Sequence, residues 1–217
     1  MFLTDEQYNE IIAMLDGSIE KSPLLKELEA WFNKEFEILI FGYLCERTIN
    51  NLTRLKIVIW SDKFQHIFRE KDSVNYDKKI QEKIAIKFSQ LAVKYNLHPE
   101  YHNYKDIFVC TDTLSDQIAS KTMWSVKDRV MSLATGDIWK IYLSGGHVHI
   151  FYETDEQIEQ HKNDGLNDRI KHQIWDIVKS VDKYNVFYKG VGCTFTSQQT
   201  LEEKYSGSMY FYLLAMV

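Results

Sequence analysis

Proline, glycine and cysteine are scarce in this chain, and each scarcity excludes a class of structure. Two prolines and nine glycines among 217 residues leave too little of either for a long flexible linker. The three cysteines, Cys45, Cys110 and Cys193, are far apart and odd in number, which argues against a disulfide framework and indicates reduced thiols in a cytoplasmic protein. We interpret them as small core residues rather than nucleophiles.

Long apolar runs and runs of basic charge are missing as well. No stretch approaches the roughly 20 apolar residues of a membrane helix, and acids stand at positions 5 and 6, where a signal peptide needs basic residues. The 26 basic and 31 acidic side chains give a net charge of −5, without the basic footprint that nucleic acid requires. We therefore expect neither a membrane nor nucleic acid as a partner.

The composition that remains is that of a globular protein rich in aromatic residues. Hydrophobic residues make up 45% of the sequence and charged residues 26%, so a chain of this length can bury a core without metals or disulfides. Aromatic residues make up 14%, and tyrosine keeps a polar tip that suits a protein interface. Tyr101 and Tyr104 lie beside polar connections and are therefore candidate partner-binding residues.

A series of short patterns occurs twice and in the same order. Each copy has a hydrophobic strand that closes on a hydroxyl residue and an aspartate, then a helix pattern that ends in Lys-Tyr-Asn, then a strand with Cys-Thr-x-Thr. An ordered series of this kind predicts an internal duplication of a strand-strand-helix-strand unit. The three pairs of positions are 61–62 and 154–155, 94–96 and 183–185, and 110–113 and 193–196.

The duplicated pattern predicts an α+β protein with extra N-terminal helices. We expect two ferredoxin-like halves about a pseudo-twofold axis, with helices covering one side of an antiparallel or mixed sheet. A single continuous sheet bent into a half-barrel is the alternative. The expected domains are a helical layer at 1–35, a first repeat at 36–135 and a second at 136–217, packed as one compact unit. The apolar tail at 209–217 is expected to be a strand buried on both faces.

The sharpest local prediction is a hairpin at 138–153. Gly145 and Gly146 suit a two-residue turn in which both central positions need positive φ. This turn fixes a register in which one face is apolar and the other is half polar. The expected apolar pairs are Leu143 with Val148, Ile141 with Ile150 and Trp139 with Tyr152, and the expected pairs on the other face are Ser144 with His147, Tyr142 with His149 and Lys140 with Phe151.

Tyr142, His147 and His149 share the second face of this hairpin and form a candidate ligand or partner site. Alternate strand residues lie on one face, so the two imidazoles are also weak candidates for a metal site. Glu153 lies at the end of the strand, too far from His147 to share one ion without a bend. We therefore expect no metal and no other cofactor, and a face that meets solvent or a partner.

No phosphate loop or nucleophile motif appears in the sequence. We expect a non-catalytic, cytoplasmic binding protein that recognises a protein partner or a small ligand in the cleft between two pseudo-symmetric halves. An immunity-type inhibitor is one such role, and a homodimer is compatible with it. The alternative is a metal-dependent enzyme or a metal-binding protein that uses His147 and His149.

Overall fold

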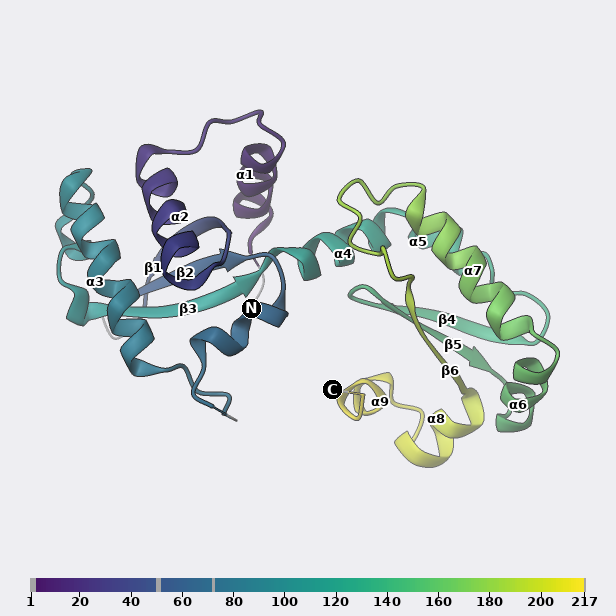
Figure 1. Ribbon diagram of the computed structural model, residues 1–217. Coiled ribbons are helices and arrows are strands. Elements are labelled where there is room, and N and C mark those ends of the chain that lie inside the picture. The colour runs from purple at the N-terminus through teal and green to yellow at the C-terminus, as the bar shows by residue number, and fades with distance from the viewer. Residues whose placement is uncertain (1–2, 50–51, 72, 217) are drawn as a thin grey trace. The chain divides into compact units, whose positions relative to one another are not determined.

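The computed structural model describes residues 3–49, 52–71 and 73–216, and the chain divides into two compact units, Met1–Ser115 and Asp116–Val217 (Figure 1). Each unit holds one three-stranded sheet with helices, which confirms a mixed α+β protein. The alternative of one continuous half-barrel sheet is wrong, because the strands form two separate sheets. The division falls after Ser115. No helix in the described part of the chain is long and apolar enough to cross a membrane.

Unit 1 begins with two helices whose ends are set by local sequence. Ser22 caps the second helix by accepting a hydrogen bond from the Leu25 backbone N–H at 3.2 Å, and Pro23 occupies its first position. That helix ends at Glu37, which is left-handed with φ of 56°. The elements of the unit are α1 (Asp5–Leu15), α2 (Pro23–Phe36), β1 (Ile40–Arg47), β2 (Thr53–Ile59), α3 (Lys78–Lys94) and β3 (Ile107–Thr113), with short 3-10 turns at η1 (Asp62–Phe68), η2 (Pro99–Tyr101) and η3 (Tyr104–Asp106).

The core of unit 1 lies between its sheet and the helices α2 and α3. Alternate residues of the central strand β2, among them Leu55 and Ile57, are fully buried against Phe32 of α2 and Phe88 of α3. The apolar stripes of both helices therefore pack against this face of the sheet. The opposite face of β2 is buried as well, since Lys56 is 3% exposed and Val58 is 0% exposed.

Unit 2 has the same kind of sheet with helices on both faces. In Figure 1, α7 lies along one face, and α8 and α9 lie against the other. The tail that we expected to be a buried strand is instead the short helix α9, which begins at a cap on Ser208. The elements are α4 (Leu114–Ser125), which starts at the end of unit 1, then α5 (Lys127–Met131), β4 (Ile138–Ser144), β5 (His147–Tyr152), α6 (Asp155–Asn163), α7 (Leu166–Lys179), β6 (Gly192–Ser197), α8 (Gln198–Tyr205) and α9 (Met209–Leu214).

The two sheets have identical topology. In each, the first two strands form an antiparallel hairpin and the third strand pairs in parallel with the second. The first strand of each sheet has an irregularity at the same place, between Ile40 and Gly42 and between Ile138 and Lys140. A ferredoxin-like half has four strands in the order β-α-β-β-α-β. In the described residues each unit has only three strands, and its first two strands form a hairpin with no helix between them.

The backbone also repeats in finer detail. The Ser115 N–H donates to the carbonyl of Trp60 at 2.8 Å, and the Gln199 N–H donates to that of Glu153 at 3.1 Å, so the start of the helix after each third strand is bonded to the residue after the second strand. The asparagines of the two Lys-Tyr-Asn patterns, Asn96 and Asn185, are both left-handed, with φ of 53° and 54°. The repeated sequence patterns therefore correspond to repeated backbone conformations.

The Cys-Thr-x-Thr pattern is the exception, because its two cysteines are not equivalent. Val109 pairs with Leu55 in unit 1, and Cys193 pairs with the corresponding Val148 in unit 2. A shift of one residue turns a side chain to the other face of the sheet. Cys193 accordingly packs against the core of unit 2, whereas Cys110 lies beside Lys56 on the opposite face of unit 1.

Candidate functional site

The predicted hairpin brings Tyr142, His147 and His149 together on one face of the unit 2 sheet. Ser144 pairs with His147 and Tyr142 pairs with His149, as predicted, and the apolar pairs Leu143–Val148 and Ile141–Ile150 are also confirmed. We call the surface formed by Tyr142, His147, His149 and Thr194 the histidine face. One pair was wrong, because the irregularity in β4 places Ile138 opposite Tyr152 and turns Trp139 out of register.

The turn between the two strands uses its glycines differently from the prediction. Gly145 has a positive φ of 58°, which favours glycine. Gly146 does not have a positive φ. A larger residue would be crowded at this position, because an added Cβ would lie 3.0 Å from the Cβ of Ala119. The glycine pair therefore fixes the register through one conformational and one steric requirement.

His147 is held against the neighbouring strand β6. Its Nε2 and the Oγ1 of Thr194 share a hydrogen bond of 2.8 Å. Its Nδ1 side lies against Gly192, where an added Cβ would be only 2.5 Å from Nδ1. Burial lowers the pKa of His147 below its ordinary value of 6.5, so the ring is neutral at pH 7. Glycine at position 192 is thus what allows the imidazole to lie flat against β6.

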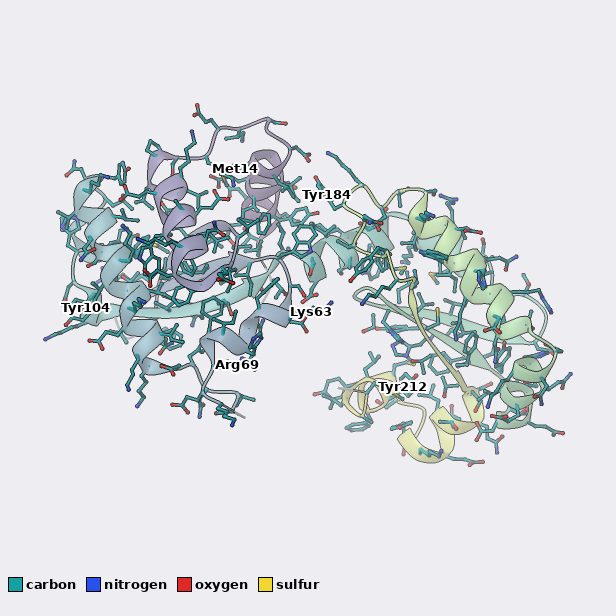
Figure 2. The ribbon with its side chains drawn as sticks, in the orientation of Figure 1. Met14, Lys63, Arg69, Tyr104, Tyr184 and Tyr212 are labelled. Carbon is teal, nitrogen blue, oxygen red and sulfur yellow. The ribbon has the colours of Figure 1, made fainter. Side chains whose placement is uncertain are left out.

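His149 is the most buried of the predicted site residues, with only 4% of its surface exposed. Its Nδ1 shares a hydrogen bond of 2.9 Å with the hydroxyl of Tyr212 on α9 (Figure 2). Burial, with a smaller contribution from His147, lowers the pKa of His149 to about 4. Burial also raises the pKa of Tyr212 to about 12. Both groups are neutral at pH 7, and together they attach α9 to the sheet.

The chemistry open to this pair of histidines follows from these bonds. The two ring centroids lie 4.9 Å apart, but one nitrogen of each ring is already hydrogen-bonded. Across the described ranges, no group of three or more His, Cys, Asp or Glu side chains is arranged to hold a metal ion. Glu153 is exposed and follows the end of β5. The arrangement is best suited to holding the fold of unit 2 together.

Tyr101 and Tyr104, the other two predicted site residues, belong to unit 1. They lie in the turns η2 and η3 and pack partly against the unit 1 core. Tyr104 is labelled in Figure 2. The Tyr101 ring meets Phe88 edge-on at 6.3 Å, and burial together with a hydrogen bond to Glu100 raises its pKa to about 12. Their polar tips therefore border the surface, but most of each ring serves the core.

The face of unit 1 that matches the histidine face is ionic, and it was not among the sites predicted from the sequence. We call Glu46, Arg54, Lys56 and Asp112 the lysine face. Lys56 occupies the place that His149 has in unit 2, is 3% exposed, and lies 3.4 Å from Glu46 and 3.7 Å from Asp112. Burial raises the pKa of Asp112, whose Oδ2 accepts no hydrogen bond from the described residues. A hollow of about 270 Å³ adjoins this cluster.

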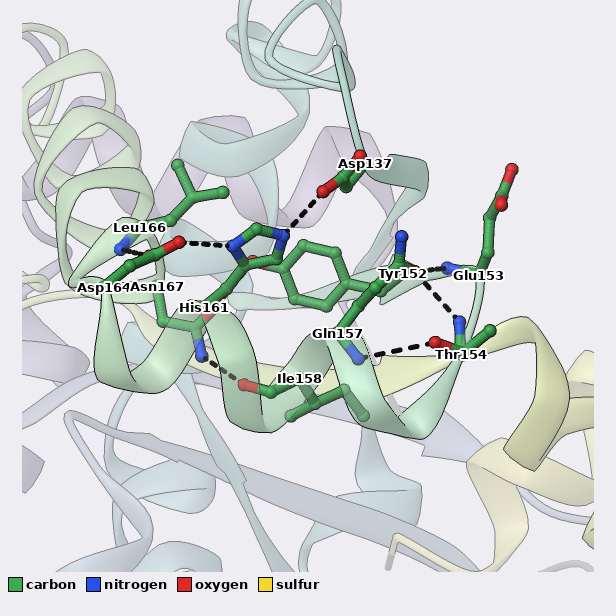
Figure 3. A network of polar contacts seen from close by, with 10 residues as sticks. All are labelled: Asp137, Tyr152, Glu153, Thr154, Gln157, Ile158, His161, Asp164, Leu166 and Asn167. Atoms are coloured by element: carbon green, nitrogen blue, oxygen red, sulfur yellow. Dashed lines mark hydrogen bonds and ion pairs between the residues drawn. The ribbon is translucent and has the colours of Figure 1, made fainter.

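A third polar cluster lies around His161 and is drawn in Figure 3. Its Nδ1 contacts Asp164 and its Nε2 contacts Asp137, each at 2.9 Å, and its ring packs 4.9 Å from that of Tyr152. The Tyr152 hydroxyl donates to Asn167 at 2.5 Å. Burial lowers the pKa of His161, but the hydrogen bonds to Asp164 and Asp137 more than offset this, so that the pKa is raised. Both ring nitrogens of His161 are hydrogen-bonded to aspartates. These bonds connect α6 to the residue before β4 and to the loop before α7.

The three thiols are buried enough to be unreactive. Burial raises the pKa of Cys45 to about 12 and that of Cys193 to about 11, and it raises the pKa of Cys110 as well. Because the thiolate is the nucleophilic form, none of the three is activated at neutral pH. Cys45 and Cys193 also pack against the cores of their units, which agrees with their interpretation as core residues, whereas Cys110 lies on the opposite face of its sheet.

A cluster of exposed apolar side chains on and after α9 was missed, because the segment was expected to be a buried strand. We call this cluster the α9 patch, and it consists of Tyr210, Phe211, Leu214 and Met216, which are 68%, 57%, 56% and 48% exposed. Tyr212, between them, is fully buried beneath the helix. Exposed aromatic residues grouped in this way are typical of a surface that binds another molecule.

No protein-family model, curated protein sequence or solved structure matches this chain.

Proposed function

We propose that this chain is a non-catalytic binding protein, built by duplication of one unit, which recognises a protein partner through unit 2. The α9 patch is the observation that carries this proposal. A large aromatic side chain covers about 150–250 Å², so the four residues together expose on the order of 400 Å². That area is about half of what one partner contributes to a standard protein interface.

The anchoring of α9 supports a built surface rather than a loose segment. Tyr212 is buried and hydrogen-bonded to His149, and its ring also packs 5.3 Å from Phe151 and 5.4 Å from Tyr205. A short helix held from below in this way presents its outer side chains with little entropy left to lose on binding. The histidine that the sequence marked as a site residue thus supports the patch from beneath.

The duplication is part of the proposal, and the shared backbone features support it. Both units have the same strand order, the same irregularity in the first strand and the same bond between strand ends. Within this common frame the outward sheet faces differ, since Lys56 corresponds to His149 and Asp112 to Thr196. Divergence of these faces suits two copies that have taken different binding roles. A cytoplasmic location and an immunity-type role stay predictions.

Capture of the partner by the full chain tests this function. The tagged protein is purified from its own cells, and whatever protein travels with it is identified. We expect the double variant Tyr210→Ser, Phe211→Ser to lose that protein, because both rings lie outside the core. Phe108→Ser removes an exposed aromatic ring from unit 1 and is the matched control, which should still capture it. Capture that survives the double variant, or a chain that purifies alone as a monomer, would contradict the proposal.

Metal binding by His147 and His149 is the second candidate, favoured only by the 4.9 Å separation of their rings. Thr194 and Tyr212 already occupy one nitrogen of each ring, so an ion could use only the other nitrogen of each ring. Metal analysis of protein purified without chelators distinguishes the two functions. Stoichiometric zinc, manganese or iron that disappears in His149→Ala would favour the metal function over partner binding.

A further inference from the structure

The outer edges of the two sheets differ, although the strands that form them are equivalent. In unit 1 the edge strand is β3, and side chains occupy its backbone groups. The Tyr76 hydroxyl accepts from the Thr111 N–H at 3.2 Å, and the Gln81 side-chain amide donates to the Val109 carbonyl at 2.6 Å. Unpaired edges are a liability in proteins and are commonly blocked. The edge of β3 is blocked in this way.

In unit 2 the edge strand is β6, and its edge is open. Backbone groups of alternate residues point to opposite sides of a strand, so Cys193 and Phe195, which correspond to Val109 and Thr111, point away from β5. In the part of the chain that the structure describes, no backbone or side-chain group bonds to their N–H and C=O groups. Figure 1 shows β6 on the outer side of its sheet. Both residues are partly exposed.

Positive charge and aromatic surface flank this open edge. Lys171 on α7 lies over the Phe195 ring, with Nζ 5.5 Å from its centroid. Lys171 and Lys189 also line a hollow of about 230 Å³ with Trp175, next to the start of β6. Residues 166–191 carry five basic and three acidic side chains, whereas the whole chain has a net charge of −5. Two basic side chains, Lys171 and Lys189, therefore lie near β6.

We propose that the edge of β6 is the docking site for an extended, acidic segment of a protein partner, which adds to the unit 2 sheet as a fourth strand. The inference rests on the proposed function, since it names the chemistry of that partner. Backbone bonds to Cys193 and Phe195 would supply affinity, and alternate side chains of the added strand would supply specificity. The side chains of the added strand that point to the helix side would lie beside Phe195 and within reach of Lys171. The positive charge of Lys171 favours a carboxylate at these positions.

Charge selects this occupant over a second copy of the chain. Pairing of β6 with its own twofold copy would bring both copies of Lys171 and Lys189 to one interface. Like charges on facing strands are destabilising, whereas a partner that carries Asp or Glu at alternate positions turns the same lysines into favourable contacts. The occupant is therefore an acidic segment of another protein.

Amide hydrogen exchange on the full chain tests whether the edge is open. The amides of Cys193 and Phe195 should exchange without protection, whereas the amide of Thr111, bonded to Tyr76 in unit 1, should be protected. Fast exchange at both β6 positions supports the inference. Protection at both in the free monomer would overturn it, because something would already cover the edge.

A peptide selection tests the occupant. Full-length protein is used to select from a library of random twelve-residue peptides, and the enriched peptides are synthesised as probes. We expect Asp or Glu at alternate positions, and slowed exchange of the Cys193 and Phe195 amides when these peptides bind. Enrichment of basic or uncharged peptides, or no enrichment, would overturn the assignment of an acidic segment.

Substitutions on the edge distinguish backbone pairing from other modes of binding. Cys193→Pro removes the outward N–H at a position where an edge strand tolerates proline, and should weaken the selected peptides about tenfold or more. Cys193→Val keeps the N–H and changes only the side chain, and should bind within about twofold of wild type. Equal affinity of Cys193→Pro and Cys193→Val would overturn strand addition.

Charge reversal gives an independent variant that does not disturb the strand. Lys171→Glu with Lys189→Glu should weaken the acidic peptides about tenfold or more. Lys127→Glu is the matched control, because Lys127 also lies over an aromatic ring, that of Trp124, but on α5. It should leave the affinity unchanged, and an equal loss in Lys127→Glu would overturn the assignment to β6.

Comparison with the captured partner separates failure of this inference from failure of the proposed function. If the Tyr210→Ser, Phe211→Ser variant loses the partner while Cys193→Pro and the double lysine variant retain it, the binding function stands and docking at β6 is overturned. If the chain forms dimers that Cys193→Pro abolishes, the occupant is a second copy, which also overturns the proposal. Loss of the partner in all of these variants supports it.

Discussion

Acidification should destabilise unit 2 through His149, because this imidazole is buried in its neutral form. The pKa of His149 is about 4 in the folded chain against 6.5 ordinarily. The unfolded state therefore binds more protons between these values, and stability that is present above pH 6.5 is lost as the pH falls through about 4. A difference of this size corresponds to about 3 kcal/mol in the free energy of unfolding.

The variant His149→Asn removes the titrating group while an amide takes the place of Nδ1 opposite Tyr212. Its stability should be lower at pH 7 because the smaller side chain leaves space, but it should fall less between pH 6.5 and 4.5 than that of wild type. Urea unfolding of the full chain, followed by circular dichroism at several pH values, measures this difference in slope. The chemical shift of the His149 ring protons gives the pKa directly by NMR.

The control variant Tyr212→Phe separates burial from hydrogen bonding. It leaves the imidazole buried but removes its partner, so it should cost about 1–3 kcal/mol at pH 7. The pH slope should remain, because burial is the principal cause of the lowered pKa. A His149 ring that titrates near pH 6.5 in wild type, or equal slopes for wild type and His149→Asn, would refute this reasoning.

Two further predictions concern the other histidines of unit 2. Because the pKa of His161 is raised in the folded chain, the stability that this group contributes is present below pH 6.5 and is lost as the pH rises through the folded pKa. Between pH 6 and pH 8.5, His161→Asn should therefore lose less stability than wild type. Thermal unfolding at the two pH values measures this difference. Gly192→Ala should destabilise the chain by about 1–2 kcal/mol by displacing His147 from Thr194, and the cost should largely disappear in a His147→Ala background. An undiminished cost in that background would contradict the steric explanation.

The hairpin at the histidine face shows what local sequence can predict about strand pairing. Alternation of apolar and polar residues and a two-glycine turn fixed the pairing of Tyr142 with His149 and of Ser144 with His147. Both features act within a few residues, so they can be recognised without knowledge of the rest of the fold. The irregularity at Trp139 breaks this alternation, and the local sequence pattern does not predict it.

The segment that forms α9 shows where periodicity fails. A short apolar run is compatible with a buried strand or with a helix segment, and its pattern does not distinguish them. Ser208, whose hydroxyl accepts from the Phe211 N–H at 3.4 Å, is the one local indication of a helix start. This cap predicts a short helix with one buried and one exposed face, and the exposed face is the α9 patch.

Local periods and turns were enough to predict the mixed α+β class, the repeated strand-strand-helix-strand order and most of the register of one hairpin. They could not predict that Tyr212 covers His149, that Lys56 lies between Glu46 and Asp112, or that Tyr76 and Gln81 block one sheet edge while the edge of β6 stays open. Those contacts join segments far apart in the chain. Burial, charge state and the satisfaction of backbone groups depend on such contacts, and therefore the candidate sites do as well.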